Sequence, residues 1–137
     1  MNNKNVLLVD DSMVFRGSIA RALRNAGYCV ATAADGEEAL RFARERLPNL
    51  IVLDVMLPRI GGLQVLHTLK KDPATSQIPI IILSSLSQQN AEKLRNDGAA
   101  AFIEKNQTDT SALIRAVNRI MELTCHDTPV GSGYPSS

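Results

Sequence analysis

Four short apolar runs in this sequence are each followed by polar residues whose types are chemically complementary. In chain order these polar residues are Asp10 and Asp11, Asp54, Ser84 and Ser85, and Glu104 and Lys105. Carboxylate oxygens are the ligands that hard divalent cations such as magnesium prefer, whereas a hydroxyl and an ammonium can hold the oxygens of a phosphoryl group. If these residues share one crevice, they indicate a site for a metal ion together with a phosphoryl group.

The strands and helices that contain or separate these polar residues decide whether the polar side chains lie close together in space. Short, continuously apolar segments that alternate with amphipathic helices are typical of a parallel sheet buried on both faces. Ligands of such open α/β sheets bind outside the carboxyl ends of the strands. We therefore expect an α/β fold in which all four polar groups lie at one edge of a single sheet.

The hydrophobic periodicity predicts five pairs of a strand and a helix. The expected strands cover about 5–10, 29–33, 50–53, 78–84 and 99–103. The first helix follows Ser12 as its N-cap and ends at Gly27, and Asp35 with Glu38 resembles the capping box of the second. The other helices are expected at about 63–69, 88–96 and 109–124.

Length and composition predict one ordinary domain at 1–124 and a disordered tail at 125–137, which is rich in Gly, Ser and Pro. The formal net charge of +1 gives no reason to expect direct nucleic-acid binding. Residues 1–11 form neither a signal peptide nor a membrane span, because two aspartates interrupt their apolar run. Two cysteines without a motif spacing favour a reduced protein, so the sequence predicts a cytoplasmic location and no membrane contact.

Five motifs together carry a resemblance to a known family: VLLVDDS, ADGEEAL, IVLDVMLPRIGG, IPIIILSS and GAAAFIEK. From residue 4 to about 124 the chain resembles the receiver domain of two-component response regulators. The resemblance implies the flavodoxin-like, doubly wound (βα)5 fold, with a five-stranded parallel sheet in the order 2-1-3-4-5.

The resemblance also assigns roles to the polar residues. It implies that Asp54 accepts a phosphoryl group from a sensor histidine kinase or a histidine phosphotransfer protein. It implies a Mg²⁺ or Mn²⁺ site made by Asp11, Asp54, the Met56 backbone carbonyl and, through a water, Asp10. It further implies that three side chains hold the transferred phosphoryl group: Ser84, Ser85 and Lys105.

A switch is the last feature that the resemblance implies. When the Ser84 hydroxyl moves toward the phosphoryl group, the Phe102 ring is expected to turn inward behind it. This movement would remodel the face formed by the helix at 88–96, the strand at 99–103 and the last helix, where a downstream protein binds. Asn106 stands where the family usually has a proline, and Phe102 stands where tyrosine is commoner.

Each residue also has an ordinary structural interpretation when it is taken alone. Asp10 and Asp11 could merely end a strand and cap a helix, and Phe102 is by default a core aromatic residue. Four such coincidences are less plausible than one shared site, so the residues favour a receiver site. Because no output domain follows Thr124 in this sequence, the favoured interpretation is a receiver that acts alone, as in chemotaxis or a phosphorelay, and that is not a turnover enzyme.

Two other functions remain open at this point. The chain could be the receiver part of a longer regulator with a DNA-binding or enzymatic output module. It could also be an aspartate-based phosphatase of the haloacid dehalogenase kind, which likewise uses a strand-end aspartate and magnesium. Such enzymes need a second aspartate two residues after the nucleophile, where this sequence has Ser12 or Met56.

Overall fold

The structure is a computed structural model, and it describes residues 4–57, 60–84, 98–105 and 110–127. Its five strands are β1 (Asn5–Val9), β2 (Cys29–Ala33), β3 (Leu50–Asp54), β4 (Ile80–Ser84) and β5 (Ala101–Glu104). They form one parallel sheet in the order β2-β1-β3-β4-β5. The predicted α/β fold and strand order are confirmed.

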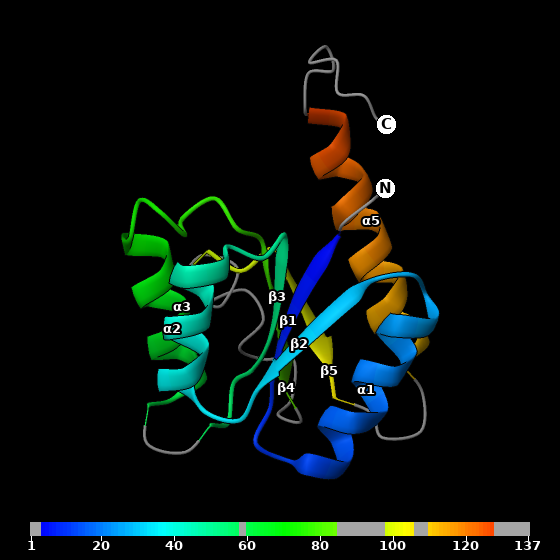
Figure 1. Cartoon of the computed structure of the whole chain (residues 1–137), viewed down its shortest axis with the longest axis horizontal. Coiled ribbons are helices and arrows are strands. Elements are labelled where there is room, and N and C mark those ends of the chain that lie inside the picture. The colour runs from blue at the N-terminus through cyan, green and yellow to red at the C-terminus, as the bar shows by residue number, and fades with distance from the viewer. Residues whose placement is uncertain (1–3, 58–59, 85–97, 106–109, 128–137) are drawn as a thin grey trace.

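The described helices cover both faces of this sheet (Figure 1). They are α1 (Met13–Asn25), α2 (Gly36–Arg46), α3 (Gly62–Lys71) and α5 (Ser111–Asp127). In β1, Leu7 and Val9 belong to the apolar cluster beneath α2 and α3, whereas Val6 and Leu8 belong to the cluster beneath α1 and α5. Both sets are buried, which is why the strands read as continuous apolar runs without alternation.

Two helices begin at the predicted capping residues. The Ser12 Oγ accepts a hydrogen bond from the Phe15 N–H at the start of α1 (3.3 Å). Asp35 Oδ1 accepts from the Glu38 N–H at the start of α2 (2.9 Å), while Glu38 Oε1 accepts from the Ala34 N–H (3.0 Å). The predicted capping box is therefore present, although its return bond reaches the residue before the cap.

The largest difference from the predicted boundaries lies at the end of the last helix. Helix α5 continues to Asp127, so residues 125–127 belong to it and not to a tail. Between Ser111 and Pro129 the sequence contains no glycine or proline, and without such a stop signal the helix continues past Thr124. The helix expected at 88–96 and the tail from 128 onward lie outside the described residues.

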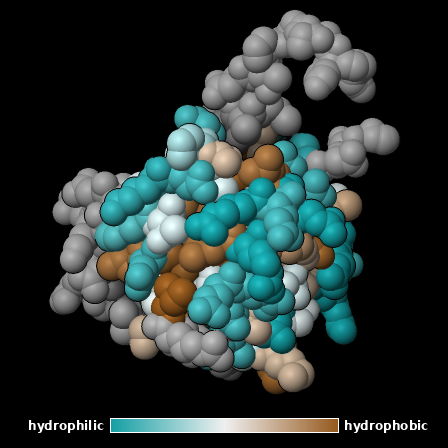
Figure 2. Space-filling view, turned by 60° about the vertical axis from the view of Figure 1, so that its left-hand side comes forward, coloured by the Kyte–Doolittle hydropathy of each residue, from teal (hydrophilic) through white to brown (hydrophobic). Residues whose placement is uncertain are grey.

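The face of the described chain that is seen in Figure 2 is largely hydrophilic. Figure 2 shows polar residues over most of one side of the molecule, with apolar residues visible in the gaps between them. Among the described helices, none combines the length and the apolar character that crossing a membrane requires.

Candidate functional site

Three aspartates gather at the carboxyl end of the sheet. Asp10 follows β1 and Asp54 ends β3, and these strands are neighbours. Asp10 and Asp54 are 0% and 1% exposed, whereas Asp11 is exposed. One carboxylate oxygen from each of the three lies within 4.8 Å of the others. The carboxylates that the sequence placed on different strand ends therefore form one cluster.

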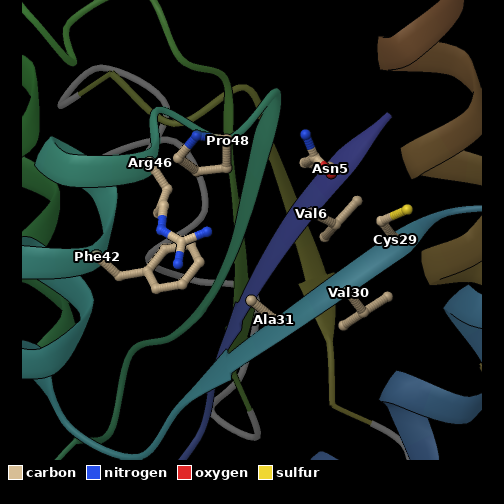
Figure 3. Close-up of a pocket in the computed structure, with 8 residues that line it drawn as sticks. All are labelled: Asn5, Val6, Cys29, Val30, Ala31, Phe42, Arg46 and Pro48. Carbon is tan, nitrogen blue, oxygen red and sulfur yellow. The ribbon is translucent and has the colours of Figure 1, made fainter. Parts of the chain in front are cut away.

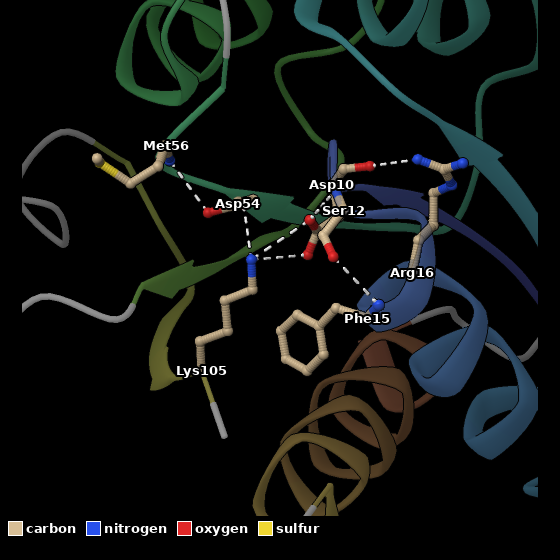
Figure 4. Close-up of polar contacts among 7 residues, drawn as sticks. All are labelled: Asp10, Ser12, Phe15, Arg16, Asp54, Met56 and Lys105. Carbon is tan, nitrogen blue, oxygen red and sulfur yellow. Dashed lines mark hydrogen bonds and ion pairs between the residues drawn. The ribbon is translucent and has the colours of Figure 1, made fainter. Parts of the chain in front are cut away.

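Lys105 follows β5 and reaches across the sheet to this cluster (Figure 4). Its Nζ donates to Asp54 Oδ2 at 2.9 Å and to Asp10 Oδ1 at 3.3 Å. The Lys105 backbone N–H donates to the Ser84 carbonyl (2.8 Å), which holds the start of this side chain against the end of β4. The predicted convergence of the ends of β1, β3, β4 and β5 is thus observed.

Backbone N–H groups orient both buried carboxylates. The Met56 N–H donates to Asp54 Oδ1 at 3.0 Å, and the Ser12 N–H donates to Asp10 Oδ1 at 2.9 Å. The Arg16 guanidinium donates to the Asp10 carbonyl oxygen at 2.8 Å and ties helix α1 to the end of β1. These bonds fix the direction of the carboxylates before any ligand binds.

Gly62 lets the start of α3 approach the end of β3 closely. A Cβ atom at this position would lie 2.4 Å from the Asp54 carbonyl oxygen and 2.5 Å from the Val55 Cα. Both atoms belong to the backbone, so neither can move aside without shifting β3. The neighbouring Gly61 has no atom within 4 Å of such a Cβ. Of these two neighbouring glycines, Gly62 is therefore the one that the close approach of α3 to β3 requires.

Burial and charge act in opposite directions on the two groups at the centre of the site. Burial raises the pKa of Asp54 above its ordinary value of 3.8, although the hydrogen bonds from Met56 and Lys105 lower it in part. For Lys105, burial alone would lower the pKa, but the hydrogen bonds and charges of Asp54 and Asp10 outweigh it, so the pKa is raised above 10.5. The ammonium therefore stays charged beside the carboxylates.

The donor set of the site suits a hard divalent cation. Three carboxylates, two of them buried, lie beside one contacting ammonium, which leaves an excess of negative charge at the site. Asp10 Oδ2 is buried and makes no hydrogen bond, although Lys105 Nζ lies 3.1 Å away in ion-pair contact. All the available ligand atoms are oxygens, and magnesium binds through one or two carboxylates while it keeps several waters.

The other predicted site residues lie around this cluster. Ser84 is the last residue of β4 and is 1% exposed. Phe102 is half-buried in β5, where it packs against the apolar cluster beneath α2 and α3. Met56 contributes its N–H, and its side chain is 57% exposed. Ser85 lies outside the described residues, and the ligand role of the Met56 carbonyl stays a prediction.

Two site contacts were missed by the sequence interpretation. The motifs in the sequence gave no site role to Phe15 or Arg16. In the structure, the Phe15 ring lies under the Lys105 ammonium and Arg16 binds the Asp10 carbonyl. The available signal was position, because both residues fall in the first turn of the helix that begins directly after Asp10 and Asp11.

A cavity of about 220 Å³ lies at the opposite, amino end of β1 and β2 (Figure 3). Phe42 and Arg46 of α2 form one wall, with the guanidinium 5.7 Å from the ring centroid. The rest of the lining is contributed by Asn5, Val6, Cys29, Val30, Ala31 and Pro48. This cavity contains no carboxylate, so it lacks the ligand set of the carboxyl end.

The chain was also compared with known proteins. It matches the sequence model of the family described as response regulator receiver domain, over residues 6–118. A gliding motility regulatory protein from Myxococcus xanthus is 36% identical over 116 residues, covering 84% of this chain and 15% of that protein. The alkaline phosphatase synthesis transcriptional regulatory protein PhoP of Bacillus subtilis is 35% identical over 124 residues, covering 88% of this chain and 51% of that protein.

Solved structures give a corresponding result. The structure of the chemotaxis protein CheY4 from Vibrio cholerae superposes with a TM-score of 0.79 at 28% identity. The match covers 86% of this chain and 98% of that one. By contrast, this chain spans less than half the length of the first curated relatives that it matches.

Proposed function

This chain belongs to the response regulator receiver domain family, and from that premise we propose that Asp54 is its phosphoacceptor. The observation that carries the proposal is the contact of a buried strand-end carboxylate with Lys105 Nζ at 2.9 Å, beside Asp10 and Asp11. The receiver is a signalling domain of two-component systems, so its phosphoryl donor is a histidine kinase or a histidine phosphotransfer protein.

The transfer exchanges one bond at phosphorus for another. An Asp54 carboxylate oxygen attacks the phosphorus of the donor phosphohistidine, and a P–O bond forms as the P–N bond breaks. The imidazole leaves with the electron pair of the broken bond. Because Asp54 Oδ1 and Oδ2 are held by the Met56 N–H and by Lys105, the carboxylate needs little reorientation before attack.

The site must also offset the charge that gathers when a carboxylate meets a phosphoryl group. A Mg²⁺ held by Asp11, Asp54 and the Met56 carbonyl, with Asp10 acting through a water, would supply positive charge at the phosphoryl oxygens. The Lys105 ammonium supplies a second positive charge from the β5 side. The Ser84 and Ser85 hydroxyl groups are the proposed donors to the remaining phosphoryl oxygens.

The output of the site is a changed surface. We place the switch at Ser84 and Phe102, which lie at the end of β4 and in the middle of β5. Movement of the Ser84 hydroxyl toward the phosphoryl group would leave room for the Phe102 ring to turn. The face formed by the helix expected at 88–96, β5 and α5 is then the proposed binding site for a downstream protein.

Two arrangements of the output occur among the relatives. The match to CheY4 covers nearly all of that chain, whereas the match to PhoP covers about half of a transcriptional regulatory protein. A receiver that acts alone is the arrangement we favour. The alternative is a receiver joined to a DNA-binding or enzymatic module, and the complete reading frame distinguishes the two.

Intact-mass measurement tests the phosphoacceptor directly. The protein is incubated with Mg²⁺ and a small acyl-phosphate donor, and Asp54→Asn is treated in parallel. Asp72→Asn is the matched control, because Asp72 pairs with Arg44 at the surface away from the site. We expect one phosphate adduct on the wild type and on Asp72→Asn, and none on Asp54→Asn or after chelation of the metal.

Two results would contradict the proposal. An adduct that persists in Asp54→Asn would place the acceptor on another residue. Absence of an adduct with every donor tried would instead indicate a pseudo-receiver, which binds partners through its surface without phosphoryl chemistry.

A further inference from the structure

Phe15 in the first turn of α1 brings its ring against the ammonium of Lys105. The Nζ atom lies 4.6 Å from the ring centroid, within the range of about 6 Å at which an aromatic face attracts a cation. Figure 4 shows the ring beside the ammonium, on the α1 side of the aspartates. Helix α1 therefore contacts Lys105 through a group that is neither an acid nor a hydrogen-bond acceptor.

The Phe15 ring is held firmly in this position. Its side chain is 6% exposed and belongs to the apolar cluster beneath α1 and α5, together with Leu83 and Leu113. Its backbone N–H donates to the Ser12 side chain that caps the helix. Because both the backbone and the ring are fixed, the ring presents a stationary surface to the mobile end of a lysine side chain.

The other partners of the Lys105 ammonium are Asp54 and Asp10, and both also take part in the proposed metal site. Lys105 Nζ contacts Asp54 Oδ2 at 2.9 Å and Asp10 Oδ2 at 3.1 Å. A divalent cation that binds these carboxylates competes with the ammonium for their oxygen lone pairs. The Phe15 ring has no metal-ligand atom, so its attraction for the Lys105 ammonium remains when the carboxylates bind the cation.

We propose that Phe15 is a positioning residue for phosphoryl transfer, because its ring keeps the Lys105 ammonium at the site while Asp10 and Asp54 bind the metal. This inference rests on the proposed function of Asp54 and adds a second anchor for Lys105. The ring acts through Lys105 and does not touch the phosphoryl group. Its contribution is to limit the positions of a long, flexible side chain before transfer.

The contact itself is tested without any phosphoryl chemistry. Protons that lie over an aromatic ring are shifted upfield in NMR spectra, so the Lys105 ε-methylene protons should resonate upfield of the other lysines. The Lys105→Arg variant assigns the signal. The shift should persist after addition of Mg²⁺, should disappear in Phe15→Leu and should remain in Phe15→Tyr. Absence of the shift in the wild type, or its loss when Mg²⁺ binds, would overturn the proposal.

The effect on the reaction is tested with the same variants and an acyl-phosphate donor. In Phe15→Leu we expect the maximal rate of phosphorylation to fall about three- to tenfold, the range for loss of one cation–π contact. The donor concentration at half-maximal rate and the Mg²⁺ affinity should change less than twofold. Phe15→Tyr should restore the rate, since the ring is retained.

Ile19→Val is the matched packing control. Ile19 lies about one turn further along α1, is 1% exposed and belongs to the same apolar cluster. Its aliphatic side chain has no aromatic face that could attract the Lys105 ammonium. A wild-type rate in a folded Phe15→Leu, or an equal rate loss in Ile19→Val, would overturn the proposal. Should the wild type form no adduct, the proposed function fails, while the NMR shift still decides whether the ring holds Lys105.

Discussion

The two ends of the sheet each contain a partly buried lysine, and the two lysines have opposite electrostatic surroundings. At the carboxyl end, Lys105 Nζ faces the carboxylates of Asp54 and Asp10. At the amino end of β4, Lys70 Nζ of α3 donates to the backbone carbonyls of Ser76 (3.0 Å) and Ile78 (2.9 Å). The Lys105 ammonium is paired with negative charge, whereas in the described part of the chain the Lys70 ammonium donates to neutral backbone carbonyls.

The pKa values of the two lysines follow from this difference. Burial lowers the pKa of Lys70 below 10.5, and among the described residues no carboxylate opposes this effect. The pKa of Lys105 is raised, because Asp54 and Asp10 outweigh the same burial effect. The pKa of a partly buried lysine is therefore raised only where carboxylates are buried beside it, as at Lys105. The carboxyl end contains the charged groups that the proposed metal and phosphoryl binding requires, whereas Lys70 holds the loop before β4 in place.

The largest expected effect is on the rate of phosphorylation, which should depend on Lys105 and not on Lys70. Lys105→Met should lower the rate of Mg²⁺-dependent phosphorylation of Asp54 by about 10²-fold, since it removes a fixed positive charge from the transferring group. Lys70→Met should leave this rate within twofold of the wild type. The measurement is intact mass against time with an acyl-phosphate donor. Equal losses in both variants would mean that the carboxyl end has no special role.

A second prediction concerns the backbone at the carboxyl end. Gly62→Ala should reduce the free energy of unfolding by about 2–3 kcal/mol, because the added Cβ meets the backbone of Asp54 and Val55. Gly61→Ala is the control and should change it by less than about 0.5 kcal/mol. Urea unfolding followed by circular dichroism measures both. A Gly62→Ala variant as stable as Gly61→Ala would contradict this prediction, because it would show that the backbone at the end of β3 shifts to accommodate the added Cβ at little cost.

The smallest effect is the titration of the lysines themselves, followed by NMR of their Cε and Nζ atoms. Lys70 should titrate below 10.5 and Lys105 above it. The contribution of Lys105 to stability is thus present below pH 10.5 and is lost as the pH rises through its folded pKa. The pKa of Lys70 is lower in the folded state than in the unfolded state, so between these two pKa values the unfolded state binds more protons. The contribution of Lys70 to folding stability therefore becomes more favourable as the pH rises toward 10.5.

Magnesium should act on one lysine only. Its charge, placed among Asp10, Asp11 and Asp54, should lower the pKa of Lys105 and leave that of Lys70 unchanged. A shift of equal size at both lysines would indicate a general ionic-strength effect and would contradict a metal site at the carboxyl end.

Much of the fold was predictable because its determinants are local. Continuous apolar runs are what strands buried on both faces require, and Ser12 and Asp35 cap their helices through bonds that span three residues. The end of α5 was less predictable. Its amphipathic pattern stops at Thr124, but backbone hydrogen bonding continues to Asp127, since no residue there interrupts it.

The sequence alone was enough to place Asp54 and Ser84 at the ends of strands and Asp10, Asp11 and Lys105 directly after strands. The rule for open parallel sheets then places these strand ends at one edge. The tertiary structure alone decided the contacts among them. It set which oxygen of Asp54 faces Lys105, and it brought Phe15 of α1 under that ammonium. A pattern along the chain specifies the element and the face of a side chain, whereas contacts between residues distant in sequence depend on how the helices and the sheet pack.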